Sequence, residues 1–477
     1  MADVTDTTHT PATVKFQASE KSKDATTTNH EVASSSGSTT KPARNIEFQP
    51  PSRYMTTQSL GVDDYFAGPR DIQKHSKLPF FMRMHGSIMP KMILPLAFVC
   101  AWATAITCIS KLVHALEVDT VLLTVLGFVV AFGLSFRCST AYERYNDGRK
   151  YWSQLTLASR NLARTIWINV DERKDAEHPE YAKQDLLGKV SAIQLINAFA
   201  VALKHRLRFE PAVDYPDLSN LVVHLPGTMA QHADQSGLRH RKPSPLKRLG
   251  EHLGVTFAQS NPRKLLKRSH QNLGNLPHEI LAHLYAYIEK VTTDDETLKS
   301  GVCQSNAYSD IRSLGDVLTG TERVLNTPLP LAYSISISQI TWAYIVVLPF
   351  QLVKQLDWIT IPATAIAAYI ILGLAMIGRE IENPFGNDVN DLPLELFCTE
   401  IAADLDVLTS IPADEYKSFV KASENRPLFP LSWGTAAEWE AQSMEEIREA
   451  LRAKATTSSK DIELERAKSN NADIQAV

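Results

Sequence analysis

Three phenylalanines recur at every fourth position of an uncharged stretch, GFVVAFGLSF, at positions 127–136. On an α-helix Phe128, Phe132 and Phe136 form one stripe, because each ring is rotated by only about 40° from the one before it. Aromatic residues at this spacing usually pack against another helix or against lipid, but the same stripe can line a passage. The spacing alone leaves both interpretations open.

A second group resembles a zinc-protease helix at first sight. The stretch LPHEILAHL contains His278, Glu279 and His283. Zinc proteases place their two histidines four residues apart, on one helix face. Here they are five apart, about 140° around a helix, and cannot share a metal in that geometry. The sequence also lacks a phosphate-binding glycine loop and a G-x-S-x-G nucleophile turn. We therefore expect no enzyme activity.

The elements that must position these residues begin with four uncharged stretches, at 92–110, 120–136, 324–353 and 358–378. The hydrocarbon core of a bilayer, about 30 Å thick, needs about 20 such residues as a helix. The second stretch is short unless its helix is tilted or shielded from lipid. Four such stretches predict an all-α, multi-pass membrane protein. The predicted membrane helices are 92–112, 118–137, 329–353 and 358–378.

Basic residues flank the cytoplasmic ends of membrane helices. Several precede the first stretch, including Arg83 and Lys91, and others follow the second, including Arg137 and Arg144. The connection between these two stretches carries only Lys111 as a basic residue. Both termini and the middle segment are therefore expected on the cytoplasmic side of a membrane that the sequence does not name.

The rest of the chain is polar or helical. With 49 basic and 53 acidic residues the net charge is −4, which does not indicate nucleic acid as a partner. The five cysteines show neither a disulfide framework nor metal-ligand spacing. Apolar residues at helical spacing predict a helical cytosolic region. The predicted boundaries are a disordered tail at 1–68, a membrane domain at 69–410 with its cytosolic part at 138–325 and a basic loop at 226–275, a C-terminal cytosolic segment at 411–453, and a disordered tail at 454–477.

Four motifs carry a family resemblance: RMHGS at 83–87, FRCSTAYERYNDGRKYWSQL at 136–155, NTPLPLAYS at 326–334 and ENPFGNDVNDLPLE at 382–395. Together they resemble the bestrophin family of anion channels, in its microbial and plant-like branch, over roughly residues 70 to 410. The resemblance implies a homopentamer with four membrane helices per subunit and one pore on the fivefold axis. It also implies passive conduction of chloride or other small anions.

The family's narrow neck is formed by three hydrophobic residues just before the F-R motif, so the resemblance places it at Phe128, Phe132 and Phe136. Edge-on rings attract anions weakly, and a narrow apolar ring can gate by dewetting. Gly127 and Gly133 leave room for close neighbouring helices. A second constriction, near the cytosolic exit, is placed at Val302 by counting alone. The alternative function is a non-conducting membrane scaffold or channel regulator with the same fold.

The run after the fourth apolar stretch forms a calcium clasp in animal members of the family. Asp388 and Asp391 match acidic positions there, and Asn383 matches a carbonyl donor. Oxygen ligands suit calcium, but Asn387, Val389 and Asn390 replace neighbouring acids. No cofactor is required by the resemblance, and calcium binding stays open. The other interpretation is structural: NPFG ends the helix, and Asp391 helps to cap the next one near Leu392–Pro393.

Overall fold

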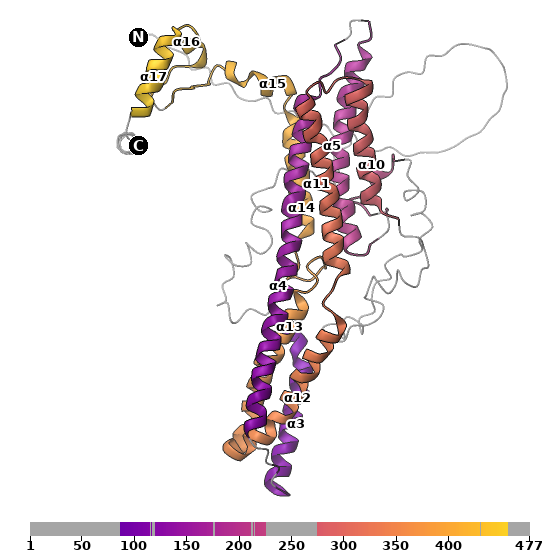
Figure 1. Ribbon diagram of the computed structural model, residues 1–477, viewed down its shortest axis with the longest axis vertical. Coiled ribbons are helices and arrows are strands. Elements are labelled where there is room, and N and C mark those ends of the chain that lie inside the picture. The colour runs from indigo at the N-terminus through magenta and orange to yellow at the C-terminus, as the bar shows by residue number, and fades with distance from the viewer. Residues whose placement is uncertain are drawn as a thin grey trace, which may run out of the picture. The chain divides into compact units, whose positions relative to one another are not determined.

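The computed structural model describes residues 86–114, 116, 120–174, 177–210, 213, 215–225, 274–429 and 431–456. All regular elements within these residues are helices (Figure 1). The predicted N-terminal tail, nearly all of the basic loop and the end of the C-terminal tail lie outside the described residues. The longest helix, α4 (Thr120–Arg164), takes part in two helical bundles.

The first half of α4 belongs to the membrane bundle. It packs with α12 (Leu331–Leu356) and α13 (Thr360–Glu380), and both of these helices pack with α3 (Met89–Leu112). A short 3₁₀ turn, Asp357–Ile359, joins α12 to α13, and Asp357 forms an ion pair with Lys111 at the end of α3. Helices are therefore present at all four uncharged stretches.

Length and apolar composition mark four spans in the described chain: Met89–Leu112, Leu123–Asn169, Glu180–Leu207 and Leu331–Glu380. The last of these contains both α12 and α13. The third, α5 (Glu180–Leu207), is different, because 61% of its apolar window is buried inside the protein, against 22–28% for the other three. Protein, rather than lipid, covers α5, so the membrane helices are α3, the first half of α4, α12 and α13.

The second half of α4 belongs to what we call the distal bundle, with α5, α10 (Leu276–Glu289), α11 (Gly301–Asn326) and α14 (Leu394–Ser410). Its core is continuous and apolar, and Trp152, Phe199 and Leu314 are almost completely buried in it. The predicted helical region between the second and third apolar stretches is present. The residues His278, Glu279 and His283 lie along α10.

The remaining helices are short: the π-helical turns η2 (Thr165–Asn169) and η4 (Lys290–Asp294), α6 (Ser219–Val222), α15 (Ala413–Ser418), the 3₁₀ turn η6 (Phe419–Lys421), α16 (Ala436–Glu440) and α17 (Met444–Thr456). The helix α17 continues through Thr456, so the prediction of a disordered tail from 454 placed that boundary too early. The sequence MEEIREALRAKAT has good helix formers at nearly every position, which accounts for the longer helix.

Two sequence motifs meet where the bundles join. Phe385 of the NPFG motif is fully buried, and its ring lies against Gly148 of α4. A Cβ atom at position 148 would come within 3.1 Å of the Phe385 ring and of Pro384. The adjacent Arg149 lies over the ring of Phe397, 4.3 Å from its centroid. These contacts fix the loop after α13 against the middle of α4.

Candidate functional site

The phenylalanine stripe lies on an exposed face of α4. Phe128, Phe132 and Phe136 are 73%, 57% and 51% exposed. The ring centroids of Phe128 and Phe132 are 6.1 Å apart in a stacked arrangement, and those of Phe132 and Phe136 are 4.5 Å apart, edge to face. The rings therefore contact one another and form one continuous apolar strip.

The other side of the same helix makes the packing contacts. Val130 and Leu134 are almost completely buried and form a cluster with Ile337 of α12. A Cβ atom at Gly127 would lie 3.3 Å from the ring of Tyr344, and one at Gly133 would lie 3.6 Å from Ile337. The two glycines thus allow close approach of α12, which is the neighbouring-helix role predicted for them. Within one subunit, α4 is anchored through the face opposite the phenylalanines.

The two sides of the phenylalanine stripe differ. Val121 and Val125 are exposed and continue the stripe itself toward the start of α4. Val129, also exposed, lies about 60° to one side of the stripe, and the exposed Ala131 and Ser135 lie about 60–100° to the other side. One flank is therefore branched and apolar, and the other is small.

Arg144, one helical turn before Gly148 on α4, connects three elements. Its Nε donates to the carbonyl of Glu382 (3.0 Å) and its Nη2 donates to the carbonyl of Val324 (2.6 Å). The Nη1 group donates to the carbonyl of Thr327. The last carbonyls of a helix have no partner within it. One guanidinium therefore satisfies the end of α11 and the loop after α13 at once.

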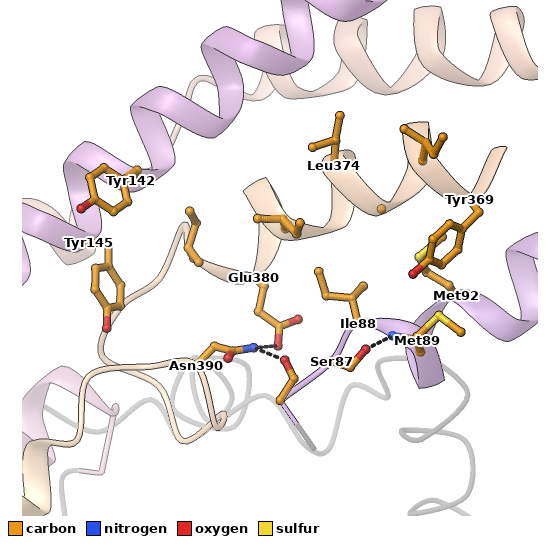
Figure 2. A pocket seen from close by; sticks show the side chains of 15 residues that line it. Ser87, Ile88, Met89, Met92, Tyr142, Tyr145, Tyr369, Leu374, Glu380 and Asn390 are labelled. Atoms are coloured by element: carbon orange, nitrogen blue, oxygen red, sulfur yellow. Dashed lines mark hydrogen bonds between the residues drawn. The ribbon is translucent and has the colours of Figure 1, made fainter. Parts of the chain in front are cut away.

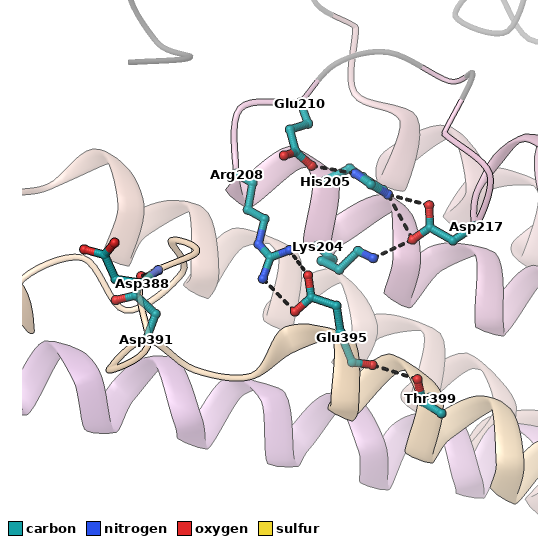
Figure 3. Close-up of polar contacts among 9 residues, drawn as sticks. All are labelled: Lys204, His205, Arg208, Glu210, Asp217, Asp388, Asp391, Glu395 and Thr399. Atoms are coloured by element: carbon teal, nitrogen blue, oxygen red, sulfur yellow. Dashed lines mark hydrogen bonds and ion pairs between the residues drawn. The ribbon is translucent and has the colours of Figure 1, made fainter. Parts of the chain in front are cut away.

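The loop 381–393 is closed by its own acidic residues, Asp388 and Asp391 (Figure 3). The Asp388 amide donates to Asp391 Oδ2 (2.8 Å), and the Asp391 amide donates to the Asp388 carbonyl (3.0 Å). Burial, with the neighbouring charges of Asp388 and Glu380, raises the pKa of Asp391 to about 7. Asn383 lies near the start of the loop, directly after Glu382.

The predicted helix cap at Asp391 is wrong. The helix α14 begins at Leu394 with Pro393 as its N-cap, and this N-cap has no side-chain capping hydrogen bond. The Asp391 carboxylate is already engaged by the Asp388 amide within the loop. Asp391 therefore stabilises the turn that precedes the helix.

A lysine reaches this loop from α3. Lys91 Nζ lies 2.7 Å from Glu380 Oε2 and 3.3 Å from Asp388 Oδ2. Among the described residues, no three or more histidine, cysteine or acidic side chains gather in a way that could hold a metal. With an ammonium against Asp388 and an amide against Asp391, the arrangement does not match the all-oxygen shell that calcium prefers.

A cavity of about 640 Å³ opens beside these residues (Figure 2). Its walls come from α3, α4 and α13 and are mostly apolar, with Met92, Tyr369 and Leu374 among them. Glu380 and Asn390 form its polar edge, where Asn390 Nδ2 donates to Glu380 Oε1 (3.2 Å) and to the Gly86 carbonyl (3.1 Å). The cavity is separate from the phenylalanine stripe.

Val302 lies at the end of α11 that is remote from the membrane bundle and the phenylalanines. It is the second residue of α11 and is 71% exposed. Arg144 binds α11 at its other end, near Val324, which is about 33 Å from Val302 along the helix axis. The structure thus places Val302 at the far end of the distal bundle, and its role as a constriction stays a prediction.

A buried histidine ties the end of α5 to the segment that follows it (Figure 3). His205 Nδ1 lies 2.8 Å from Glu210 Oε2, and its Nε2 lies 3.0 Å from Asp217 Oδ1. Lys204 also pairs with Asp217, and Arg208 pairs with Glu395 of α14. A neutral imidazole has only one N–H, so both carboxylates can accept a hydrogen bond only when His205 is protonated.

This pair predicts a pH-dependent stability. Burial opposes the charge of His205, but hydrogen bonds from its ring to Asp217 and Glu210 outweigh burial and raise its pKa above the ordinary 6.5. The stabilisation is complete below pH 6.5 and is lost as the pH rises through the raised pKa of the folded state. We expect the melting temperature to fall as the pH is raised through this range.

The measurement is a thermal melt at a series of pH values. His205→Gln should remove that part of the pH dependence, whereas His178→Gln, at a histidine that is about half exposed, should keep it. A pH profile that is the same in wild type and His205→Gln would contradict the assignment.

Sequence reasoning used Lys91 and Arg144 only as basic residues that flank membrane helices, and it missed their partners and the role of His205. Glu380 and Lys91 lie next to uncharged stretches. A charged residue at such a position is a candidate for an ion pair, and this signal could have identified both residues. Nothing local in the sequence identifies which partners they have, because the two are 289 residues apart.

An all-helical chain with four membrane-crossing helices defines a multi-pass integral membrane protein. A family model described as "Bacterial/Fungal Bestrophin protein" matches residues 69–407, and the chain belongs to this bestrophin family. The resemblance predicted from the four motifs is confirmed, over nearly the predicted range.

Curated relatives share this range. A voltage-dependent anion channel-forming protein of Synechocystis is 31% identical over 337 residues, covering 69% of this chain and 91% of the relative. One from Nostoc is 32% identical over 285 residues, covering 60% and 76%. A solved bacterial bestrophin homologue from Klebsiella pneumoniae, a point variant, is 24% identical with a TM-score of 0.49, covering 67% of this chain and all of that one.

Proposed function

We propose that this protein is an anion-selective channel, a homopentamer whose pore is lined by the first half of α4. The observation that carries the proposal is the exposed phenylalanine stripe on a helix whose opposite face is already packed. The relatives' names, voltage-dependent anion channel-forming proteins, supply the class of substrate.

A single α4 cannot enclose a pore, so the passage needs several subunits. The two flanks of the phenylalanine stripe differ, with the branched Val129 on one side and the small Ala131 and Ser135 on the other. A branched flank of one helix can pack against the small flank of the next, which is a head-to-tail contact. Such contacts close into a ring when the rotation per subunit fits, and the family resemblance gives five subunits.

In this arrangement Phe128, Phe132 and Phe136 form the neck. Ring edges carry partial positive charge and favour anions over cations, and a narrow apolar passage resists wetting. The cytosolic constriction is proposed at Val302, at the opposite end of the distal bundle. Basic residues beside α3 and in the middle of α4 favour the cytoplasmic side for both chain termini and the distal bundle.

The proposal is tested by two measurements on one preparation of purified full-length protein. Native mass measurement should return five subunits, and liposomes containing the protein should release chloride but retain potassium. A pentamer without anion flux would favour the alternative, a non-conducting scaffold or regulator. A monomer or dimer would overturn the channel proposal itself.

A further inference from the structure

The corner where α3 begins and α13 ends is held by a positive charge from the chain itself. Lys91 Nζ bridges Glu380 Oε2 at 2.7 Å and Asp388 Oδ2 at 3.3 Å. The Glu380 side chain is only 11% exposed, whereas that of Asp388 is 64% exposed. Contact with Glu380 is therefore the stronger part of the bridge, because solvent screens it less.

The neighbouring loop residues carry less negative charge than a calcium loop would. Asn390 is neutral, and its amide donates to the other oxygen of Glu380 and to the Gly86 carbonyl. These bonds join the segment directly before α3 to the end of α13 and to the loop after it, beside the Lys91 bridge. One ammonium and one amide thus satisfy both oxygens of the Glu380 carboxylate.

We propose that the Lys91 ammonium takes the place of a metal cation at this corner, so that the loop 381–393 is held in its folded form without calcium. A cation here has two tasks: to offset the charges of Glu380 and Asp388, and to tie α3 to the loop. Lys91 performs both, and it does so at every calcium concentration because it is covalently part of α3. This inference concerns stability and does not depend on conduction.

Removing the ammonium should expose the need for a cation. In Lys91→Met the carboxylates of Glu380 and Asp388 lose their shared partner and repel each other. The variant should melt several degrees below wild type in a chelator, and millimolar calcium chloride should recover part of the loss, since a ligand that binds only the folded state stabilises it. Lys91→Met combined with Asp388→Asn should lose the calcium response.

The experiment is thermal unfolding of the full-length protein in detergent, with calcium chloride or with a chelator. Lys150→Met serves as the matched control, because Lys150 is an exposed lysine of α4 whose partner is Asp147, one helical turn away. Wild type and this control should melt at the same temperature under both conditions. Lys91→Arg, which keeps the charge, should also be indifferent to calcium.

Three results would overturn the proposal. Wild type could show a saturable stabilisation by calcium that Asp388→Asn removes, which would mean that the loop binds the metal despite Lys91. Lys91→Met could be as stable as Lys150→Met in the chelator. Lys91→Met could also be destabilised but indifferent to calcium, which would make Lys91 an ordinary ion-pair partner. The first of these results is measured on wild type and Asp388→Asn, so it does not require that a Lys91 variant folds.

Discussion

The triple variant Phe128→Ala, Phe132→Ala and Phe136→Ala is expected to assemble like wild type and to conduct more. The three side chains are more than half exposed in the subunit, so their removal takes few packing contacts from it. On the pore axis, their loss widens the apolar neck and lowers its dewetting barrier. A barrier lower by about 1.4 kcal/mol corresponds to an approximately tenfold larger flux.

If the same residues are packing residues, the triple variant should assemble less well and conduct less than wild type. If the rings fill contacts with neighbouring helices, each truncation should cost about 3–5 kcal/mol and reduce assembly and flux together. Single-channel current and pentamer yield must therefore be measured on one preparation. If the triple variant loses its pentamer, or keeps wild-type conductance and gating, the phenylalanines are packing residues and do not line the pore.

Leu134→Ala is the matched control for the phenylalanine variants. Leu134 lies on the same helix, but it is 2% exposed and packs against α12. Its truncation should cost about 2–5 kcal/mol, lower the melting temperature and leave the conductance of surviving pentamers unchanged. The contrast between the two faces of α4 separates a lining residue from a packing residue.

Arg144→Met should produce the largest loss of stability of any single change considered. It leaves the carbonyls of Val324, Thr327 and Glu382 without their donor, and each hydrogen bond to a charged group contributes about 1.5–3 kcal/mol. Arg144→Lys should recover little of the lost stability, because an ammonium is a point donor and lacks the planar guanidinium that reaches three carbonyls.

The control is Arg160→Met, which removes an arginine from the same helix. Arg160 pairs with Asp404 at a partly exposed position, and such pairs contribute about 0–1 kcal/mol. Thermal melts and pentamer yield of the variants give the comparison. Equal melting temperatures for Arg144→Met and Arg160→Met would show that the carbonyls find other partners and that Arg144 does not hold the junction.

The membrane helices could be predicted from the sequence because the absence of charge over about 20 residues has one dominant physical cause. The helix α5 is also long and apolar enough to cross a membrane, yet protein covers it. In the sequence, the charged residues within α5, such as Lys189 and Lys204, are what distinguish it from the four uncharged stretches. Apolarity alone does not distinguish a lipid-facing helix from one buried in a protein core.

The phenylalanine stripe was visible because its residues are close in sequence and obey helical periodicity. The bridges of Lys91 to Glu380 and of Arg144 to three carbonyls join residues that are 180 or more positions apart. Such pairings depend on how the helices pack, which no local pattern encodes. The capping role expected of Asp391 failed for a related reason, since the amide of Asp388 competes for the same carboxylate.

The uninterrupted length of α4 has a mechanical consequence. Its 45 residues form a rod about 68 Å long, with Phe128 near one end and the core of the distal bundle around the other. A rod without a hinge pivots as one piece, so a tilt of about 5° at one end displaces the other by about 6 Å. A ligand, a partner or a voltage-driven charge that tilts the distal bundle would therefore also move the phenylalanines, because α4 has no hinge between the two.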